Sequence, residues 1–385
     1  MSLRTLNIEV RKNLHCANVF LQFDQNLTET EFLKINVEEN ALKLRGLSTE
    51  TNIDVTKYFT IEAKTMSNLT VEECNASFRL SINNIQKEAK ADQRRKQIFA
   101  PQLLEGTAAT LCCANCECIL INEQQFNKIR EFPTGTVDMG QFFCHHGPSF
   151  DNILVPQTND LFYGFEFIVL NYKTLETATK YKEGHIYCKR CLQYLGWTMF
   201  SDKAAKLWTD TLHFQIENKK QDIFYKHPTP LTSQLLQRII KDATVDMEPL
   251  LTQIQFSKIV LQSTFPNRKY KYVLLQILEK ELCVLRNETP LALGGVNNNN
   301  VLQVELEPYK SFKLLYRLIE DESEESKSTV LLNYWQQDIS ISTMQISPTL
   351  FSNLLGELDE NSLLLPEVYR FTQDDFQLSY IFYKN

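Results

Sequence analysis

The sequence predicts a β-rich α+β protein in three parts, and three observations support this prediction. Apolar and polar residues alternate in short runs through the first part of the chain, which is typical of strands. Two Cys-x2-Cys pairs bracket the centre, and strand-like and helix-like segments are mixed after them. We expect a β-rich N-terminal sandwich or barrel over 1–100, a zinc-binding region with an inserted functional loop over 101–200, and an α+β domain over 201–385.

The N-terminal part contains five runs of alternating residues. Many short strands in succession favour an antiparallel sandwich or barrel. No catalytic constellation stands out here, so we interpret this part as a scaffold or docking surface. The apolar positions of the runs are Leu6, Ile8 and Val10; Val19, Leu21 and Phe23; Leu33, Ile35 and Val37; Phe59, Ile61 and Ala63; and Phe78, Leu80 and Ile82.

A charged segment, 83–105, follows and is interpreted as a connecting helix or linker. Its basic cluster, 87–96, favours a solvated face over a phosphate site.

The C-terminal part mixes both kinds of element. Ser347 and Pro348 form a helix-start signal, with proline at the first helical position, and Thr232-Ser233 can cap another helix. We therefore predict helices through Ile240 and through Leu355. Strands are expected over 208–216 and 271–278 and around Tyr380 and Phe382, with exposed loops at 297–300 and 320–325.

Composition limits the classes of partner. The 385 residues, 43% of them hydrophobic, can form two or three domain-sized units. A formal net charge of −7 without a basic stripe does not indicate direct nucleic-acid binding. No signal-like segment or long apolar run indicates a membrane. Ten cysteines in an expected intracellular, reducing compartment indicate metal ligands and thiols instead of disulfides.

The cysteine pairs are the strongest chemical signal in the chain. Cys113 and Cys116 form the first pair, and Cys188 and Cys191 form the second. Two such pairs can present four thiolates tetrahedrally to one zinc ion, and four protein ligands leave no position open for water. We therefore predict one structural zinc. The alternative is four unrelated core cysteines, because cysteine is often buried.

Three further residues near these pairs could also act as ligands. Cys112 and Cys118 flank the first pair, and His185 precedes the second. The two Cys-x2-Cys pairs are preferred because each closes a knuckle with the metal.

An enzymatic hypothesis rests on Cys144, which His145 and His146 follow. A nearby imidazolium can lower a thiol pKa and make the thiolate nucleophilic, so a thioester-forming cysteine is possible. Neighbours in a chain need not face each other, and no Asp or Asn partner can be assigned. The alternatives are a structural cysteine or an accessory metal ligand together with His146.

A binding hypothesis rests on Asn159, Asp160, Leu161 and Phe162. An amide, a carboxylate and an aromatic ring on one loop make an insertion element, in which the ring anchors and the carboxylate pairs with a cation or metal. The alternative is a turn in which Asn159 or Asp160 caps its own backbone before a strand. From the residues alone, the turn is favoured.

Four motifs together resemble the HECT-like, E2-binding ubiquitin-protein ligase family. The similarity in order and spacing covers about residues 110–196. The motifs are Cys113-x2-Cys116, Phe143-Cys144-His145-His146, Asn159-Asp160-x-Phe162-x-Gly164, and Cys188-Lys-Arg-Cys191 followed by Leu195-Gly196. The resemblance implies a ubiquitin-conjugating enzyme as partner. It also implies binding to the metallo-β-lactamase-fold endonuclease of pre-mRNA cleavage and polyadenylation, and a cytoplasmic and nuclear location.

The resemblance assigns the plug of the nuclease active site to Asn159, Asp160 and Phe162, with Cys144 and His146 as helpers. Leu161 stands where relatives can carry a metal-ligating cysteine, so Asp160 would supply the metal-facing oxygen. Ligase chemistry is the alternative function. A HECT enzyme is expected to carry its thioester cysteine near the C-terminus, whereas the last cysteine here is Cys283.

Overall fold

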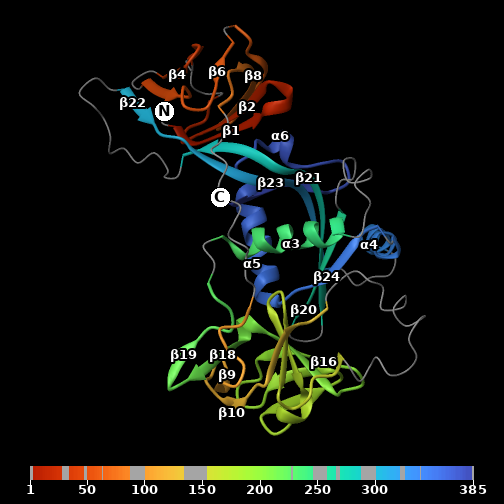
Figure 1. The fold of residues 1–385 in the computed structure, drawn as a ribbon. Coiled ribbons are helices and arrows are strands. Elements are labelled where there is room, and N and C mark those ends of the chain that lie inside the picture. The colour runs from red at the N-terminus through yellow and green to blue at the C-terminus, as the bar shows by residue number, and fades with distance from the viewer. Residues whose placement is uncertain are drawn as a thin grey trace.

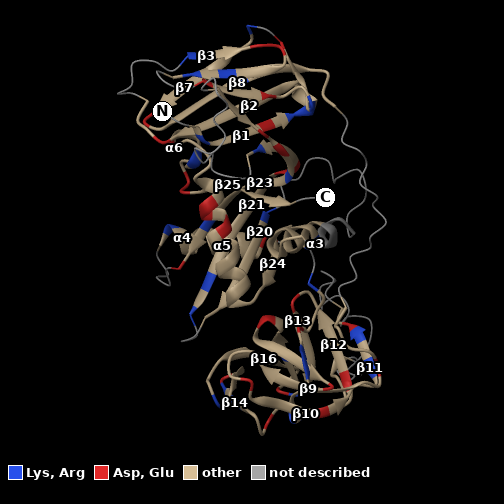
Figure 2. Cartoon of the chain, turned by 90° about the vertical axis from the view of Figure 1, so that its left-hand side faces the viewer, with Lys and Arg blue, Asp and Glu red and all other residues tan. Residues whose placement is uncertain are grey.

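The computed structural model describes most of the chain, and it has a β-dominated α+β fold (Figure 1). Among the described helices, none is long and apolar enough to cross a membrane. Figure 2 shows acidic and basic residues interspersed over the strands. The described residues are 3–27, 34–46, 50–62, 64–86, 100–133, 154–226, 229–245, 258–265, 269–287, 301–320, 326–338 and 340–383.

The largest sheet has ten strands and joins the two ends of the chain. Its main order is β24-β20-β21-β1-β2-β8-β6, with β23 on β21, β25 on β23 and β7 on β8. The bounds are β1 Leu3–Arg11, β2 Cys16–Phe23, β6 Thr60–Ile61, β7 Ser67–Glu72, β8 Asn75–Asn83, β20 Lys258–Thr264, β21 Tyr270–Arg286, β23 Glu307–Ile319, β24 Ser342–Gln345 and β25 Gln377–Tyr383.

Strand β21 links the N-terminal part of the chain to the C-terminal part. It has 17 residues, and its last residues pair with β1, with Asn7 opposite Arg286. Its first residues pair with β20, with Tyr270 opposite Thr264. Backbone hydrogen bonding therefore joins the parts predicted as separate domains over 1–100 and 201–385 (Figure 1).

A four-stranded sheet faces the β1-β2-β8 portion of the large sheet, and the two share one core. The alternation predicted for the N-terminal strands is seen in Leu6 and Ile8, both fully buried. Strand β22 comes from the C-terminal part and pairs in parallel with β5. Neither of these two sheets closes into a barrel in the described structure. The order is β22-β5-β4-β3, with β3 Lys34–Val37, β4 Ala41–Arg45, β5 Glu50–Asp54 and β22 Val301–Val304.

The central unit consists of two further sheets, at the opposite end of the molecule from the N-terminus (Figure 1). One has the order β10-β9-β18-β19, and the other β11-β12-β13-β17-β16-β15-β14. A bridge between Pro101 and Phe224 brings the ends of the unit together, so it extends beyond residue 200. The bounds are β9 Ala108–Cys113, β10 Ile119–Gln125, β11 Lys128–Glu131, β12 Asp160–Gly164, β13 Phe167–Asn171, β14 Thr179–Lys182, β15 His185–Cys188, β16 Tyr194–Met199, β17 Ala204–Trp208, β18 Leu212–Ile216 and β19 Lys219–Gln221.

Helices cover both faces of the large sheet. Alternate residues of β20 explain why: Ile259 and Leu261 point to the core that α3 and α5 share, and Val260 points to the core under α4. These helices are α3 Leu231–Val245, α4 Lys327–Gln337 and α5 Pro348–Ser362, and a short α6 spans Glu367–Arg370.

Both predicted helices are present, but only one begins as expected. The Oγ of Ser347 accepts a 3.1 Å hydrogen bond from the N–H of Leu350 at the start of α5, with Pro348 in its first turn. The cap proposed for the other helix was wrong, because α3 already begins at Leu231. There the Oγ of Ser233 donates to the carbonyl of Pro230.

Candidate metal centre

Two chain reversals with the same backbone pattern form the centre. At the end of β9, the N–H of Glu117 donates to the carbonyl of Cys113; at the end of β15, the N–H of Leu192 donates to that of Cys188. Glu117 and Leu192 have φ values of 59° and 60°, left-handed conformations that complete each tight reversal. The two Cys-x2-Cys segments therefore fold as similar knuckles.

The knuckles bring four thiols together. Sγ of Cys113 lies 3.7 Å from Sγ of Cys191, and Sγ of Cys116 lies 3.6 Å from Sγ of Cys188. All four sulfurs lie within 4.8 Å of one another. Sulfurs about 2.3 Å from a central zinc ion in a tetrahedron are about 3.8 Å apart, so the arrangement fits such an ion. The four cysteines could hold a metal.

The surroundings of the thiols differ across the centre. Burial raises the pKa of Cys113 to about 12, although the N–H groups of Cys116 and Asn115 act to lower it. The pKa of Cys191 is lowered to about 6. Burial acts to raise it, but the N–H of Gln193 and the side chain of Asn115 lower it by more. Metal binding would hold all four groups as thiolates and release their remaining protons.

Two residues between the cysteines also join the knuckles, and the sequence analysis did not single them out. The side chain of Asn115 hydrogen bonds to Cys191, and Nη1 of Arg190 donates to the carbonyl of Cys116 at 3.3 Å. Their only sequence signal is a polar residue within each Cys-x2-Cys motif. The partners are distant in sequence, so the pairing could not be assigned from it.

The flanking candidates lie outside the four-thiol group. Cys112 precedes Cys113 on β9, so its side chain points to the other face of the strand. The Sγ of Cys118 contacts the carbonyl of Ile119 at 3.7 Å. Nδ1 of His185 lies 3.4 Å from the Tyr194 hydroxyl. None of the three joins the four-thiol group.

The expected functional loop needs a correction, because Asp160–Gly164 form strand β12. This strand pairs with β11 on one edge and with β13 on the other. Leu161 is 0% exposed and Asp160 is 8% exposed, while Phe162 is half-buried and Asn159 is exposed. The reason is that Leu161 packs into the core that also contains Cys113 and Cys188.

Local hydrogen bonds hold the start of β12. Oδ2 of Asp160 accepts a 3.1 Å hydrogen bond from the N–H of Gln157, the kind of backbone contact that the turn alternative requires. Oδ1 of Asn159 accepts a 2.7 Å hydrogen bond from Nε2 of Gln124, which ties the segment to β10. The segment is thus attached to the strand that follows the first knuckle.

Steric contacts explain why glycine stands at positions 164 and 196, the two glycines of the sequence motifs. A Cβ on Gly164 would lie 2.2 Å from the ring of Phe167. A Cβ on Gly196, where φ is +155°, would lie 1.9 Å from the carbonyl oxygen of Lys206 on the adjacent strand. Cys144, His145 and His146 lie outside the described residues.

Four thiols that hold one metal ion would leave no coordination position for water, so the fold and centre define a β-rich protein with a cysteine cluster that could hold a structural metal. A family model described as HECT-like ubiquitin-conjugating enzyme (E2)-binding matches residues 9–378, and the chain belongs to this family. A mouse protein named as an E3 ubiquitin-protein ligase is 24% identical over 304 residues, 76% of each chain. The human protein of the same name is 22% identical over 325 residues, covering 77% of this chain and 78% of the relative. No solved structure matches the chain.

Proposed function

We propose that this protein binds a ubiquitin-conjugating enzyme and promotes ubiquitin transfer to substrates. The observation that carries the proposal is the family match across 9–378, which includes all three sheet-forming parts of the fold. A surface assembled from several parts of the chain requires those parts to be held together. We assign this role in the central unit to one zinc ion on Cys113, Cys116, Cys188 and Cys191.

The binding test uses the full chain and a panel of purified ubiquitin-conjugating enzymes, each charged and uncharged. Saturable binding of at least one enzyme, together with faster ubiquitin discharge from it, is the expected result. A panel in which no enzyme binds would contradict the proposal. Metal-depleted protein serves as a second arm, because loss of the zinc should weaken the binding.

The route of transfer is tested separately through Cys144. We expect no thiol-sensitive ubiquitin adduct on the wild-type chain, which would then promote direct discharge from the conjugating enzyme. An adduct on the wild type that Cys144→Ala abolishes would establish this cysteine as an acceptor and contradict the expectation. Non-reducing electrophoresis after mixing with a charged enzyme provides the readout.

Capture of the metallo-β-lactamase-fold nuclease is a second candidate function. The specific observation in its favour is that Asn159 is exposed immediately before β12, with the partly exposed Phe162 on that strand. The Asp160 carboxylate accepts a backbone hydrogen bond, so metal ligation by it requires this turn to open. Affinity purification from nuclear extract distinguishes the candidates: the nuclease supports capture, and conjugating enzymes alone support the ligase role.

A further inference from the structure

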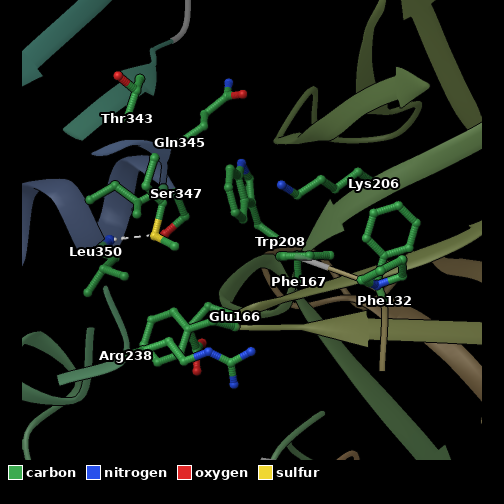
Figure 3. A pocket seen from close by; sticks show the side chains of 14 residues that line it. Phe132, Glu166, Phe167, Lys206, Trp208, Arg238, Thr343, Gln345, Ser347 and Leu350 are labelled. Atoms are coloured by element: carbon green, nitrogen blue, oxygen red, sulfur yellow. Dashed lines mark hydrogen bonds between the residues drawn. The ribbon is translucent and has the colours of Figure 1, made fainter. Parts of the chain in front are cut away.

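A cavity of about 280 Å³ lies where the central unit meets the C-terminal part of the large sheet (Figure 3). The central unit contributes Phe167, Lys206 and Trp208. The C-terminal part contributes Gln345, which ends β24, and Leu350, in the first turn of α5. The lining therefore requires both parts of the chain.

The ammonium group of Lys206 is the unusual feature of this cavity. Its Nζ lies 4.0 Å from the ring centroid of Phe167, 4.6 Å from that of Trp197 and 5.4 Å from that of Trp208. Strand pairing causes this grouping, because Trp197 lies opposite Lys206 and Phe167 lies opposite Trp208. Lys206 and Trp208 are two residues apart on β17, so they share one face.

The acidic groups near the cavity have other partners. Oε2 of Glu166 accepts a 2.9 Å hydrogen bond from the Thr209 hydroxyl, and Oδ2 of Asp210 accepts a 2.5 Å hydrogen bond from the Ser347 hydroxyl. Burial raises the pKa of both carboxyl groups. No carboxylate of the described structure forms an ion pair with Lys206.

The second cation in the lining is already paired. Nη2 of Arg238 lies 2.9 Å from Oε1 of Glu131. Burial lowers the pKa of Lys206 to about 8, so about nine-tenths of the ammonium remains charged at pH 7. Cation–π contacts offset only part of the free-energy cost of burying an ion. Within the described ranges of the chain, this one positive charge in the cavity therefore lacks an anion.

We propose that this cavity binds one carboxylate group attached to a small apolar body, with the carboxylate on the ammonium of Lys206. The aromatic and aliphatic walls, including Phe132 and Leu350, suit the apolar body. A single unpaired cation matches one negative charge, and the nearby Glu166 disfavours a phosphate dianion. The carboxylate can belong to a free acid or to the C-terminus of a peptide.

The test uses tryptophan fluorescence, because two of the three tryptophans, Trp197 and Trp208, flank the ammonium. The probes are 4-phenylbutyrate and its neutral amide for a free acid, and N-acetyl-Gly-Phe and its C-terminal amide for a peptide end. We expect at least one acid to quench the fluorescence saturably. Its dissociation constant should be at least tenfold lower than that of its amide. Preference for one acid identifies the source, and inorganic phosphate should not compete.

Lys206→Met removes the charge, and Lys258→Met is the matched control. Lys258 also lies over a tryptophan, 5.1 Å from the Trp335 ring centroid, but it does not line the cavity. We expect at least a tenfold loss of acid binding in Lys206→Met and no change in Lys258→Met. Equal binding of acids and amides to the wild type, or full binding by Lys206→Met, would overturn the proposal. The acid–amide comparison decides the question even where Lys206→Met does not fold.

Discussion

The Sγ atoms of Cys113 and Cys191 lie 3.7 Å apart, although 78 positions separate the two residues in the sequence. The first cysteine ends β9 of one sheet, and the second follows β15 of the other. A metal bound at this point would cross-link two sheets and close a long loop. Closure of a long loop by a cross-link restricts the unfolded chain strongly, so a bound metal would stabilise the central unit.

We predict one zinc ion per chain, measured by metal analysis of purified protein. Cys188→Ser should abolish stoichiometric zinc and the cooperative unfolding of the central unit, because structural zinc contributes apparent folding energy of about 10–16 kcal/mol. Cys118→Ser is the control, since its sulfur lies outside the four-thiol group. Zero or two zinc equivalents in the wild type would contradict the assignment.

Gly196→Ala should destabilise the protein by about 1–3 kcal/mol or more, because the added Cβ collides with the carbonyl of Lys206 on β17. Urea unfolding gives the change. The matched control is Gly356→Ala in α5, where a Cβ meets no atom within 4 Å. That substitution should stabilise the protein by up to about 1 kcal/mol, because alanine favours a helix interior. Similar changes in unfolding free energy for the two substitutions would show that the collision with the Lys206 carbonyl does not determine the effect at Gly196.

The Asp160→Ala substitution distinguishes the hypothesis of a backbone-capping turn from that of a plug for the nuclease active site. Removal of the buried carboxylate leaves the N–H of Gln157 without its acceptor, so we expect a loss of about 1–3 kcal/mol in unfolding free energy. Asn159→Ala, at an exposed position, should change stability little. Nuclease affinity is measured on the same preparations. Unchanged stability with a large loss of nuclease affinity would show that the carboxylate acts on the partner.

A buried charge network should make stability fall in acid. Oε1 of Glu9 lies 2.5 Å from Nζ of Lys313 and accepts a 2.5 Å hydrogen bond from the Tyr380 hydroxyl. Oε2 accepts from Nδ2 of Asn18 at 2.9 Å and from Nη2 of Arg11 at 3.3 Å. Burial acts to raise the pKa of Glu9, but Lys313 and the hydrogen bonds from Tyr380 and Asn18 lower it below its ordinary value of 4.5.

The direction of this pH dependence follows from proton binding to Glu9. Below pH 4.5 the unfolded chain takes up a proton before folded Glu9 does, so the stabilisation present at neutral pH is lost as pH falls through the folded pKa. Glu9→Gln should remove this pH dependence and cost about 3–5 kcal/mol at pH 7, because Lys313 stays buried without its anion. Glu9→Gln with Lys313→Met should be more stable than Glu9→Gln alone. Urea unfolding at pH 7 and pH 4 tests each expectation.

The sequence determined the features that depend on neighbouring residues. Period-2 alternation of apolar residues predicted β1 and β2, because the apolar face of each strand packs into the N-terminal core. The Ser347-Pro348 signal predicted the start of α5, because a cap hydrogen bond joins residues three positions apart. The spacing of the cysteines also predicted which four thiols meet, because each knuckle is local and a tetrahedral site needs two of them.

The tertiary structure decided what distant segments do to one another. The pairings of β1 with β21, of β21 with β23 and of β23 with β25 together placed Glu9 beside Lys313 and Tyr380, and no local pattern encodes a register across so many residues. No sequence pattern indicated that the side chain of Leu161 would pack into the core that contains Cys113 and Cys188 and so hold β12 as a strand. Lys206 looked like an ordinary charged residue. Two of its three aromatic neighbours lie on other strands, Phe167 on β13 and Trp197 on β16, and only the pairing of these strands with β17 brings them to Lys206.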